Sequence, residues 1–394
     1  MIEPTQIHEV HGSVLKSFQG CRLQYKWNFV DGYSAPITPA PLEFGSAFHI
    51  GMETLYDPET WSLPLNELYQ LAKDEFTKVC LAQLRTYLER AELYQLDPEA
   101  ETEYNERITL GCGMLKKVAR TMDRKNFTPV LVEKEAFVPI YFPGTEIQLQ
   151  CKCDDCWHKY LESGLSVQEK DFDFWDGLPV FYGFRVDAVL VDSQGRYWLV
   201  DWKSAAQLLK DQTILELDNQ VGSYLWALRY MTKLDLQGFQ YVQILKDYPK
   251  PPKRLVRSRL GRSFSVTKNA RTDAVTFKST VEKRDPSAYQ QGLYNEHIAW
   301  LKKFGPQFIK WHTIHKTDEQ LAVIGEDLTY AIIDLLNDPR IYPTGGRITC
   351  AQCRFQEPCL ERQSGGDYVE ILNTQYEKME PYYVIQRERR RADT

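Results

Sequence analysis

The sequence has no run of about 18 to 20 apolar residues, the length that a helix needs to cross a bilayer. The segment from Met1 to Thr5 has neither the basic nor the apolar part of a secretory leader, so we expect a cytoplasmic protein with no membrane partner. An excess of positive charge is also missing, because 48 Lys and Arg stand against 54 Asp and Glu, a net charge of −6. The surface as a whole will therefore not attract a polyanion, and any nucleic-acid site must be local.

The sequence also lacks internal repeats, low-complexity tracts and a phosphate loop of the form Gly-x4-Gly-Lys-Ser/Thr. These absences exclude a solenoid, and they mean that ATP-driven unwinding of DNA would need a partner. What is present is typical of a folded protein: 394 residues, 43% hydrophobic and 26% charged, allow a large core. The nine cysteines of a cytoplasmic chain are expected to be thiols, so clustered ones favour metal or cluster ligands over disulfides.

Hydrophobic periodicity predicts an α/β core. One predicted helix carries an apolar stripe at steps of four, four and three residues, formed by Phe44, Phe48, Met52 and Leu55. His49 lies at the edge of this stripe. Polar residues at 192–196 predict the turn of a hairpin. Other helices are predicted over 13–29, within 63–125 and over 217–231, 288–311 and 317–336, and strands over 128–140, 181–191, 197–202 and 240–245.

The predicted hairpin carries the residues that suggest chemistry. Asp201 and Lys203 are two apart on one strand and share a face, and pairing can bring Asp187 of the other strand beside Asp201. Two carboxylates can hold a hard divalent cation, and a neighbouring ammonium can stabilise the charge that develops in phosphodiester hydrolysis. A surface hairpin with an ordinary salt bridge is the alternative.

These residues resemble the PD-(D/E)XK nuclease superfamily, in which an acidic residue on one strand is followed on the next by an acidic-x-Lys triplet. Two further motifs are similar to those of its RecB-type branch, Gly45-Ser46-Ala47-Phe48-His49 before the hairpin and Gln220-Val221-Gly222-Ser223-Tyr224 after it. The resemblance implies a restriction-endonuclease-like fold, a central mixed sheet flanked by helices. It also implies a role for each of the matching residues.

By this resemblance, Mg²⁺ or Mn²⁺ is held by His49, Asp187, Asp201 and the backbone carbonyl of Trp202, and Lys203 is the catalytic lysine. Gln220 and Tyr224 are one helical turn apart, so both could reach the substrate backbone or the lysine. Taken alone, a histidine at a helix edge or a polar pair on a helix face is more often structural. An acidic residue on the preceding strand, Glu133 or Glu135, could also face the metal, and the sequence does not decide which.

The cysteines form two groups. Cys350, Cys353 and Cys359 have the spacing C-x2-C-x5-C, and one cysteine near the start, Cys21, can supply a fourth thiolate. This arrangement resembles the iron–sulfur nucleases, which include the AddB-type nuclease subunit and the CRISPR adaptation nuclease. The resemblance implies a [4Fe-4S] cluster that closes the two ends of the chain, with four-thiolate zinc as the alternative.

The second group has no counterpart in the family pattern. It contains three cysteines and a histidine within eight residues, and it could bind Zn²⁺ or be a surface loop of thiols: Cys151, Cys153, Cys156 and His158.

A basic segment interrupts the acidic average of the chain. It predicts an arm that contacts DNA, with a solvated hairpin as the alternative, and its cations include Lys253, Arg254, Arg257, Arg259 and Arg262.

We expect one elaborated nuclease domain over 1–394. Within it we predict a helical insert over 56–127, a cysteine-containing insert over 141–180 and a basic β-rich insert over 246–285. A cluster-binding loop over 341–362 and a polar tail over 363–394 follow.

The function implied is a metal-dependent DNA nuclease, an exonuclease on single-stranded DNA or DNA ends. It would act in recombination, repair or phage DNA processing, with a helicase or recombinase as partner. The protein would be bacterial, or encoded by a phage and active in the cytoplasm of the host. The alternatives are a catalytically silent DNA-end-binding or assembly module with the same fold, and a thiolate–zinc protein with no nuclease role.

Overall fold

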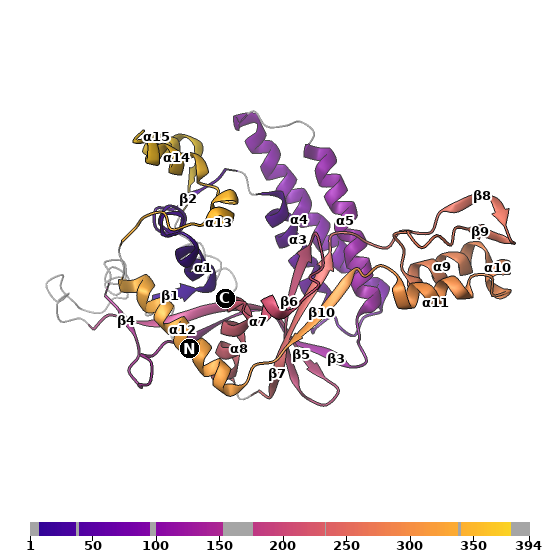
Figure 1. Cartoon of the computed structure of the whole chain (residues 1–394), viewed down its shortest axis with the longest axis horizontal. Coiled ribbons are helices and arrows are strands. Elements are labelled where there is room, and N and C mark those ends of the chain that lie inside the picture. The colour runs from indigo at the N-terminus through magenta and orange to yellow at the C-terminus, as the bar shows by residue number, and fades with distance from the viewer. Residues whose placement is uncertain are drawn as a thin grey trace.

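The computed structural model describes residues 8–36, 39–94, 100–152, 176–232, 234–337 and 340–379. Within these ranges, seven strands form a mixed central sheet with the path β1-β5-β6-β7-β10, and β3 and β4 also pair with β5 (Figure 1). The strands are β1 His8–His11, β3 Phe127–Pro139, β4 Gln150–Cys151, β5 Leu178–Asp192, β6 Tyr197–Ala205, β7 Leu236–Leu245 and β10 Ile309–Ile314. The predicted α/β fold with a mixed sheet is confirmed.

Strand β5 is the longest strand of the sheet, and its pairing creates a gap. Antiparallel β3 runs along one edge of β5, from Phe181 to Asp192. On the other edge, parallel β1 pairs with residues 180–183 and antiparallel β6 pairs with residues 188–191. The intervening residues 184–187 have no backbone ladder on that edge among the described strands. Asp187 therefore lies where β5 and β6 separate.

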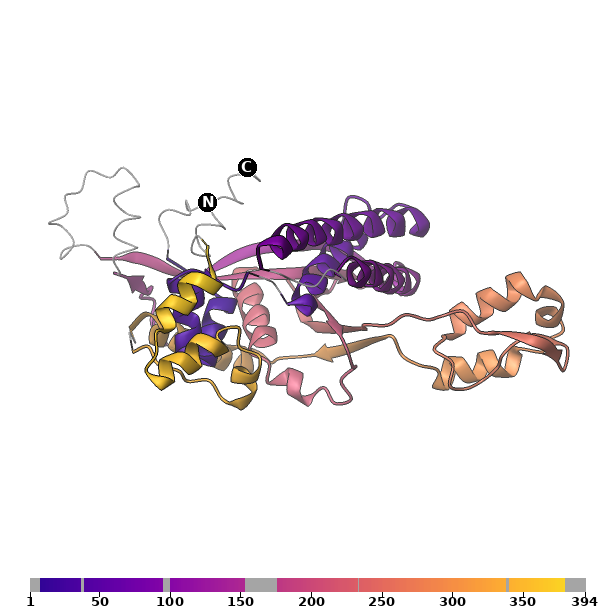
Figure 2. The ribbon, with the colours of Figure 1, turned by 90° about the horizontal axis from the view of Figure 1, so that it is seen from above.

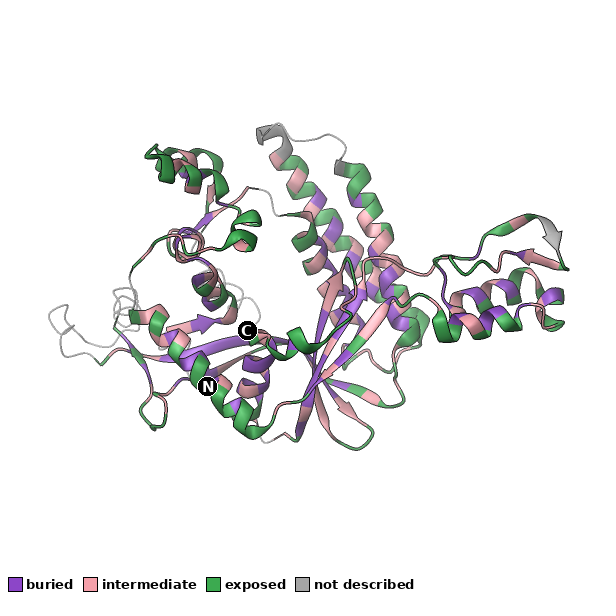
Figure 3. Ribbon diagram, in the orientation of Figure 1, coloured by how far each residue is buried: buried purple, intermediate pink, exposed green. Residues whose placement is uncertain are grey.

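Helices cover both faces of the sheet. The helices α3 Ala40–Leu55, α4 Leu65–Tyr94 and α5 Ala100–Thr121 pack on one face through a shared hydrophobic cluster that includes Val200 and Trp202. The helices α1 Gly12–Gly20, α8 Asn219–Met231 and α12 Asp318–Asn337 belong to the other face, where Leu199 and Phe239 are buried. In Figure 3 the buried segments run along the strands and the sides of the helices that face the sheet. The predicted stripe of α3 is buried as expected.

The two ends of the described chain form one module. The prediction of a continuous helix over 13–29 is wrong, because α1 ends at Gly20 and Cys21 is extended, with φ −161° and ψ 113°. The turn lets Cys21 pack in a small core with Phe355 from the other end of the chain. The module also contains α2 Arg22–Tyr25, the π-helix Lys26–Val30, β2 Tyr33–Ser34, α13 Arg347–Ala351, α14 Gln356–Ser364, α15 Tyr368–Gln375 and β11 Glu377–Lys378. Strand β11 pairs with β2, which ties the segment after residue 363 to the start of the chain.

A separate lobe, which we call the arm, projects from the end of β7 (Figure 2). It contains β8 Arg254–Arg259, β9 Arg262–Phe264, α9 Ala274–Arg284, α10 Pro286–Gln290 and α11 Asn295–Phe304, around a core of its own. The segment predicted as β-rich thus holds two short strands and a helix. The prediction of one helix over 288–311 is wrong, because α10 ends at Gln290 and turns separate it from α11. Gly305 and Pro306 then end α11, and β10 follows.

Helix α7 Thr213–Glu216 lies between β6 and α8. Within the ranges listed above, none of the helices has the length and apolar character of a membrane span.

Candidate active site

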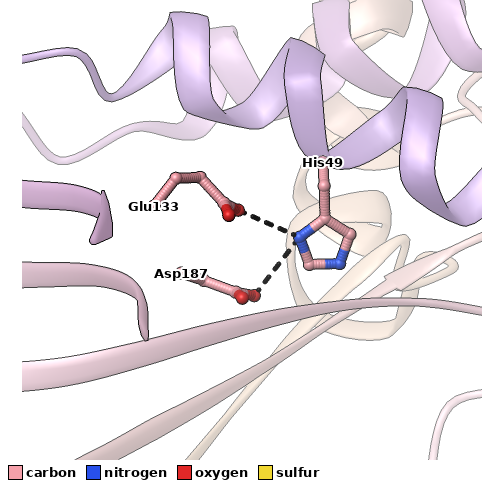
Figure 4. A group of neighbouring side chains, drawn as sticks. All are labelled: His49, Glu133 and Asp187. Atoms are coloured by element: carbon pink, nitrogen blue, oxygen red, sulfur yellow. Dashed lines mark ion pairs between the residues drawn. The ribbon is translucent and has the colours of Figure 1, made fainter. Parts of the chain in front are cut away.

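Three side chains from different elements point toward one another at the gap in the sheet (Figure 4). Nδ1 of His49, on α3, lies 3.5 Å from Oε1 of Glu133, on β3, and 3.5 Å from Oδ2 of Asp187, on β5. One possible ligand atom from each residue lies within 4.8 Å of the other two, and the described residues contain no other group of this kind. The spacing suits a shared cation.

Local structure explains how His49 and Glu133 reach this point. Phe48 is almost fully buried under α3 and fixes the rotation of the helix, so the neighbouring His49 points toward the sheet. The register of β3 on β5 places Glu133 opposite Asp187. Glu133 has a φ of +49°, a left-handed conformation that is costly for a residue other than glycine. Nε of Arg185 lies 2.7 Å from Oε2 of Glu133 and leaves Oε1 to face His49.

Strand β6 supplies the second acidic residue and the lysine. Because β5 and β6 separate at this point, the backbone N–H of Trp202 donates a hydrogen bond of 2.8 Å to Oδ2 of Asp187 instead of to a strand carbonyl. Nζ of Lys203 donates a hydrogen bond of 2.7 Å to Oδ1 of Asp201, whose side chain is 3% exposed. The tertiary structure therefore brings Asp187, Asp201 and Lys203 to one place.

Burial and charge perturb the ionisation of this group. Burial and, after it, the Asp201 carboxylate together raise the pKa of Asp187 to about 7, against the opposing charges of His49 and Lys203. Burial lowers the pKa of Lys203, but the two carboxylates outweigh it and hold that pKa above its ordinary value. Burial also lowers the pKa of His49, yet Glu133 and Asp187 raise it overall. Without a cation, the carboxylates of Asp187 and Asp201 repel each other.

The donor set fits a divalent cation. Two buried carboxylate oxygens, Oε1 of Glu133 and Oδ2 of Asp201, accept no hydrogen bond from the residues that the structure describes. An anionic oxygen buried without a donor is costly, and a hard cation such as Mg²⁺ or Mn²⁺ is the partner that carboxylates and an imidazole can share. Asp201 lies outside the group of three formed by His49, Glu133 and Asp187. Glu133 is therefore added to the ligands expected from the sequence.

Helix α8 brings the Gln220 and Tyr224 side chains toward the same place. Asp218 caps the helix by accepting hydrogen bonds from the backbone N–H groups of Gln220 and Val221. Burial raises the pKa of Tyr224, and a hydrogen bond with Gln220 lowers it. The charge of Asp201 raises this pKa as well, whereas that of Lys203 lowers it. Tyr224 therefore lies close enough to Asp201 and Lys203 for their charges to act on its hydroxyl.

Sequence reasoning left Glu133 and Glu135 undecided and missed three neighbours. Oε1 of Glu135 lies 3.9 Å from Nδ1 of His11, away from His49. Glu53, Arg185 and Tyr241 border the site. Burial and the charge of Glu133 raise the pKa of Glu53, and burial and Asp201 raise that of Tyr241, which lies opposite Asp201 in the β6–β7 register. Glu53 follows His49 by one helical turn, a spacing that the sequence does contain.

The four cysteines predicted to bind a cluster meet in the terminal module. A side-chain carbon at Gly345 would lie 3.1 Å from Sγ of Cys350 and 3.6 Å from Cβ of Cys21. Burial raises the pKa of the Cys353 thiol, and the other three thiols raise it further. The backbone N–H of Phe355 points at Sγ of Cys353, 3.4 Å away.

The four thiols differ in exposure. Cys350 is exposed, Cys353 and Cys359 are partly exposed, and Cys21 is buried in a small apolar core. The side-chain amide of Gln363 lies 3.9 Å from Sγ of Cys359 and can donate to it, as amides do to metal-bound thiolates. No three of these sulfurs lie within 4.8 Å of one another in the described part of the chain.

The other predicted metal site cannot be placed, since Cys153, Cys156 and His158 lie outside the described residues. Cys151 is buried at the end of β4. The predicted DNA-binding residues lie on the arm, where Lys253 and Arg254 are exposed and Arg262 is partly buried. The side chains of Arg257 and Arg259 lie outside the described part of the structure.

A mixed sheet between two helical layers, with a cation-binding group beside a buried acidic residue and a lysine, defines a metal-dependent hydrolase of the α/β class. The chain belongs to the PD-(D/E)XK nuclease superfamily, whose family model matches residues 12–360. No curated protein matches the chain.

Proposed function

We propose that this nuclease is a Mg²⁺- or Mn²⁺-dependent deoxyribonuclease, and specifically an exonuclease that acts on single-stranded DNA or on DNA ends. One observation carries the proposal: His49, Glu133 and Asp187 converge close to the buried Asp201 and its half-buried hydrogen-bond partner Lys203. A bound divalent cation in such a site polarises the scissile phosphate and lowers the pKa of a water molecule.

The protein's own residues have distinct roles in this proposal. Asp201 uses Oδ1 to orient Lys203 and keeps Oδ2 available as a metal ligand. Lys203 remains an ammonium at neutral pH, since its pKa is raised, so it stabilises negative charge on the phosphate and does not act as a base. Gln220 and Tyr224, which interact with each other on α8, would position the substrate backbone. The carbonyl of Trp202 would complete the ligands.

Replacement of the lysine tests the catalytic assignment. Lys203→Ala should reduce cleavage of a labelled single strand in Mg²⁺ or Mn²⁺ by about 100- to 1000-fold, because a charge aimed at the transition state is lost. Lys78→Ala, which removes an exposed lysine on α4, is the matched control and should leave the rate unchanged. If Lys203→Ala cleaves as fast as wild type, the proposed site is wrong. If the wild type binds DNA but cleaves no single-stranded, duplex, flap or RNA substrate, the chain is a silent DNA-binding module.

The exonuclease assignment needs a substrate without ends. Circular single-stranded DNA should survive while a linear strand of the same sequence is degraded, and labels at the 5′ and 3′ ends then give the polarity. Degradation of the circle would instead show an endonuclease. An enzyme specific for DNA ends would serve recombination, repair or phage DNA processing in a bacterial cytoplasm, beside a helicase or recombinase that supplies the ends.

We further propose that Cys21, Cys350, Cys353 and Cys359 hold a [4Fe-4S] cluster whose role is structural. The proposal rests on the C-x2-C-x5-C spacing and on the charge interaction of the Cys353 thiol with the other three, and four-thiolate zinc is its alternative. Anaerobically purified protein should contain about four irons per chain and show a broad band at about 400 nm, and Cys353→Ser should lose both and be less stable. Cys80→Ser, which replaces a buried cysteine of α4, is the control and should keep the colour. Colourless wild-type protein with stoichiometric zinc would contradict the cluster and leave the nuclease site untouched.

A further inference from the structure

The tip of the β8–β9 hairpin has an unusual turn. The hairpin tip, residues 259–262, joins Arg259 and Arg262, which lie directly opposite each other in the register. Leu260 and Gly261 between them have φ values of +50° and +74°. Two consecutive residues with positive φ form the type I′ turn, for which Asn-Gly is the favoured pair. A leucine at the first position is strained, because its side chain is crowded in the left-handed conformation.

Three features of the hairpin tip oppose stability. Leu260 is strained, and its side chain is 83% exposed, so no burial offsets the strain. Val256, on the neighbouring strand, is fully exposed as well. The two residues that flank the turn and are partners in the backbone register are both arginines. An exposed apolar residue in a strained turn between cations points to a role in binding.

The hairpin is nevertheless held firmly on the helices of the arm. The hydroxyl of Tyr294 accepts hydrogen bonds of 3.1 Å from the backbone N–H groups of Ser263 and Phe264, and donates one of 2.6 Å to Asp285. Phe264 is buried in the core of the arm with Tyr294. The strand that follows the turn is therefore fixed, and Leu260 is presented to solvent on a rigid support.

The charge around the tip identifies the kind of partner. From Lys250 to Lys268 the sequence contains seven Lys and Arg and no Asp or Glu, in a chain whose net charge is −6. Such a local excess of cations complements a phosphate backbone. The arm also begins where β7 ends, and Tyr241 on β7 pairs with Asp201, so the arm leaves the sheet a few residues beyond the candidate active site. Figure 2 shows the hairpin at the far end of the arm.

We propose that Leu260 is a wedge that inserts between neighbouring bases of duplex DNA, while the arginines of the hairpin hold the adjacent phosphates. Leucine side chains inserted into a base step unstack it, and phosphate contacts offset the cost of unstacking. The inference rests on the proposed function for its DNA substrate. It adds a duplex-opening contact, remote from the metal site, that prepares an end for a nuclease acting on single strands.

Leu260→Asn separates this role from a structural one. Asparagine tolerates positive φ and pairs well with the following glycine, so the variant should melt at the same or a higher temperature than wild type. In a Lys203→Ala background, which prevents cleavage, wild-type Leu260 should increase the fluorescence of 2-aminopurine placed near the end of a duplex. Leu260→Asn should lose this increase and keep its affinity for single-stranded DNA.

Two controls complete the experiment. Leu88→Gln removes an exposed leucine on α4 and should retain the fluorescence increase. Arg262→Gln should weaken the binding of every DNA and reduce the slope of log affinity against log salt by about 1.

The outcomes are distinct. If the Leu260→Asn protein unstacks the duplex as wild type does, or if wild type binds the duplex without any fluorescence change, the wedge is refuted while the nuclease assignment stands. If wild type binds no nucleic acid at all, both proposals fail.

Discussion

Asp187→Asn should stabilise the metal-free protein at pH 8 and remove its response to divalent cations. Burial, with the Asp201 carboxylate, raises the pKa of Asp187 to about 7 from an ordinary value of 3.8. A carboxyl group whose pKa is higher in the folded state than in the unfolded chain destabilises the fold when it ionises. The difference of about 3 in pKa corresponds to roughly 4 kcal/mol at pH 8 and about 2 kcal/mol at pH 5. The wild type without metal should therefore lose stability as the pH rises from about 4 to about 7.

Asparagine removes the charge and keeps the local contact. Its side-chain oxygen can still accept the hydrogen bond from the backbone N–H of Trp202, which Asp187 accepts at 2.8 Å. The metal-free variant should consequently be more stable than wild type, by more at pH 8 than at pH 5. With Mg²⁺ or Mn²⁺ the gap should close, because a cation at 1,000 times its dissociation constant adds about 4.1 kcal/mol to the wild type, which binds it, and nothing to the variant.

Denaturant unfolding in EDTA at pH 5 and pH 8, followed by titration with each cation, measures both effects. Asp192→Asn, at the last residue of β5, is a control for which we expect the opposite change in stability. Hydrogen bonds from Trp198 and Arg196 hold the pKa of Asp192 below its ordinary value, so its loss should destabilise the protein at both pH values. Our account of the site is refuted if metal-free Asp187→Asn is no more stable than wild type at pH 8, or if cations stabilise it equally.

Two further predictions concern the arm. A side-chain carbon on Gly113 of α5 would collide with the ring of Tyr248, which follows β7, so Gly113→Ala should cost about 1–3 kcal/mol of stability in thermal melts. Gly45→Ala, on α3 with open space around it, should instead be neutral or stabilising by up to about 1 kcal/mol, and equal effects of the two changes would contradict this packing. His297 lies between the rings of Phe277 and Trp300, and burial lowers its pKa, with neighbouring cations lowering it further. Wild type should therefore lose stability as the pH falls below 6.5, where only the unfolded chain takes up the proton. The melting temperature of His297→Phe should change less than that of wild type between pH 8 and pH 5. Parallel curves of melting temperature against pH would rule the effect out.

Local patterns predicted the parts of this protein that depend on near neighbours in the chain. Alternation along a strand requires Asp201 and Lys203 to share a face, and the 3.6-residue period of α3 places His49 beside a buried stripe. The hairpin and the α/β core follow from the same patterns, and the central mixed sheet was implied by the resemblance to the nuclease superfamily. The break at Cys21 and the end of α11 were missed, since periodicity averages over several residues and does not resolve a single extended residue or a Gly-Pro stop.

Tertiary structure alone selected the partners that come from distant segments. Glu133 and Glu135 look equivalent in the sequence, and only the pairing of β3 along the far edge of β5 places Glu133 opposite Asp187 and sends Glu135 to His11. The separation of β5 from β6, which directs the N–H of Trp202 to Asp187, likewise depends on β1 pairing with the other half of β5. Side-chain period is a property of one element, whereas register and strand order are set by how many elements bury their apolar faces together, and no short stretch of sequence contains that information.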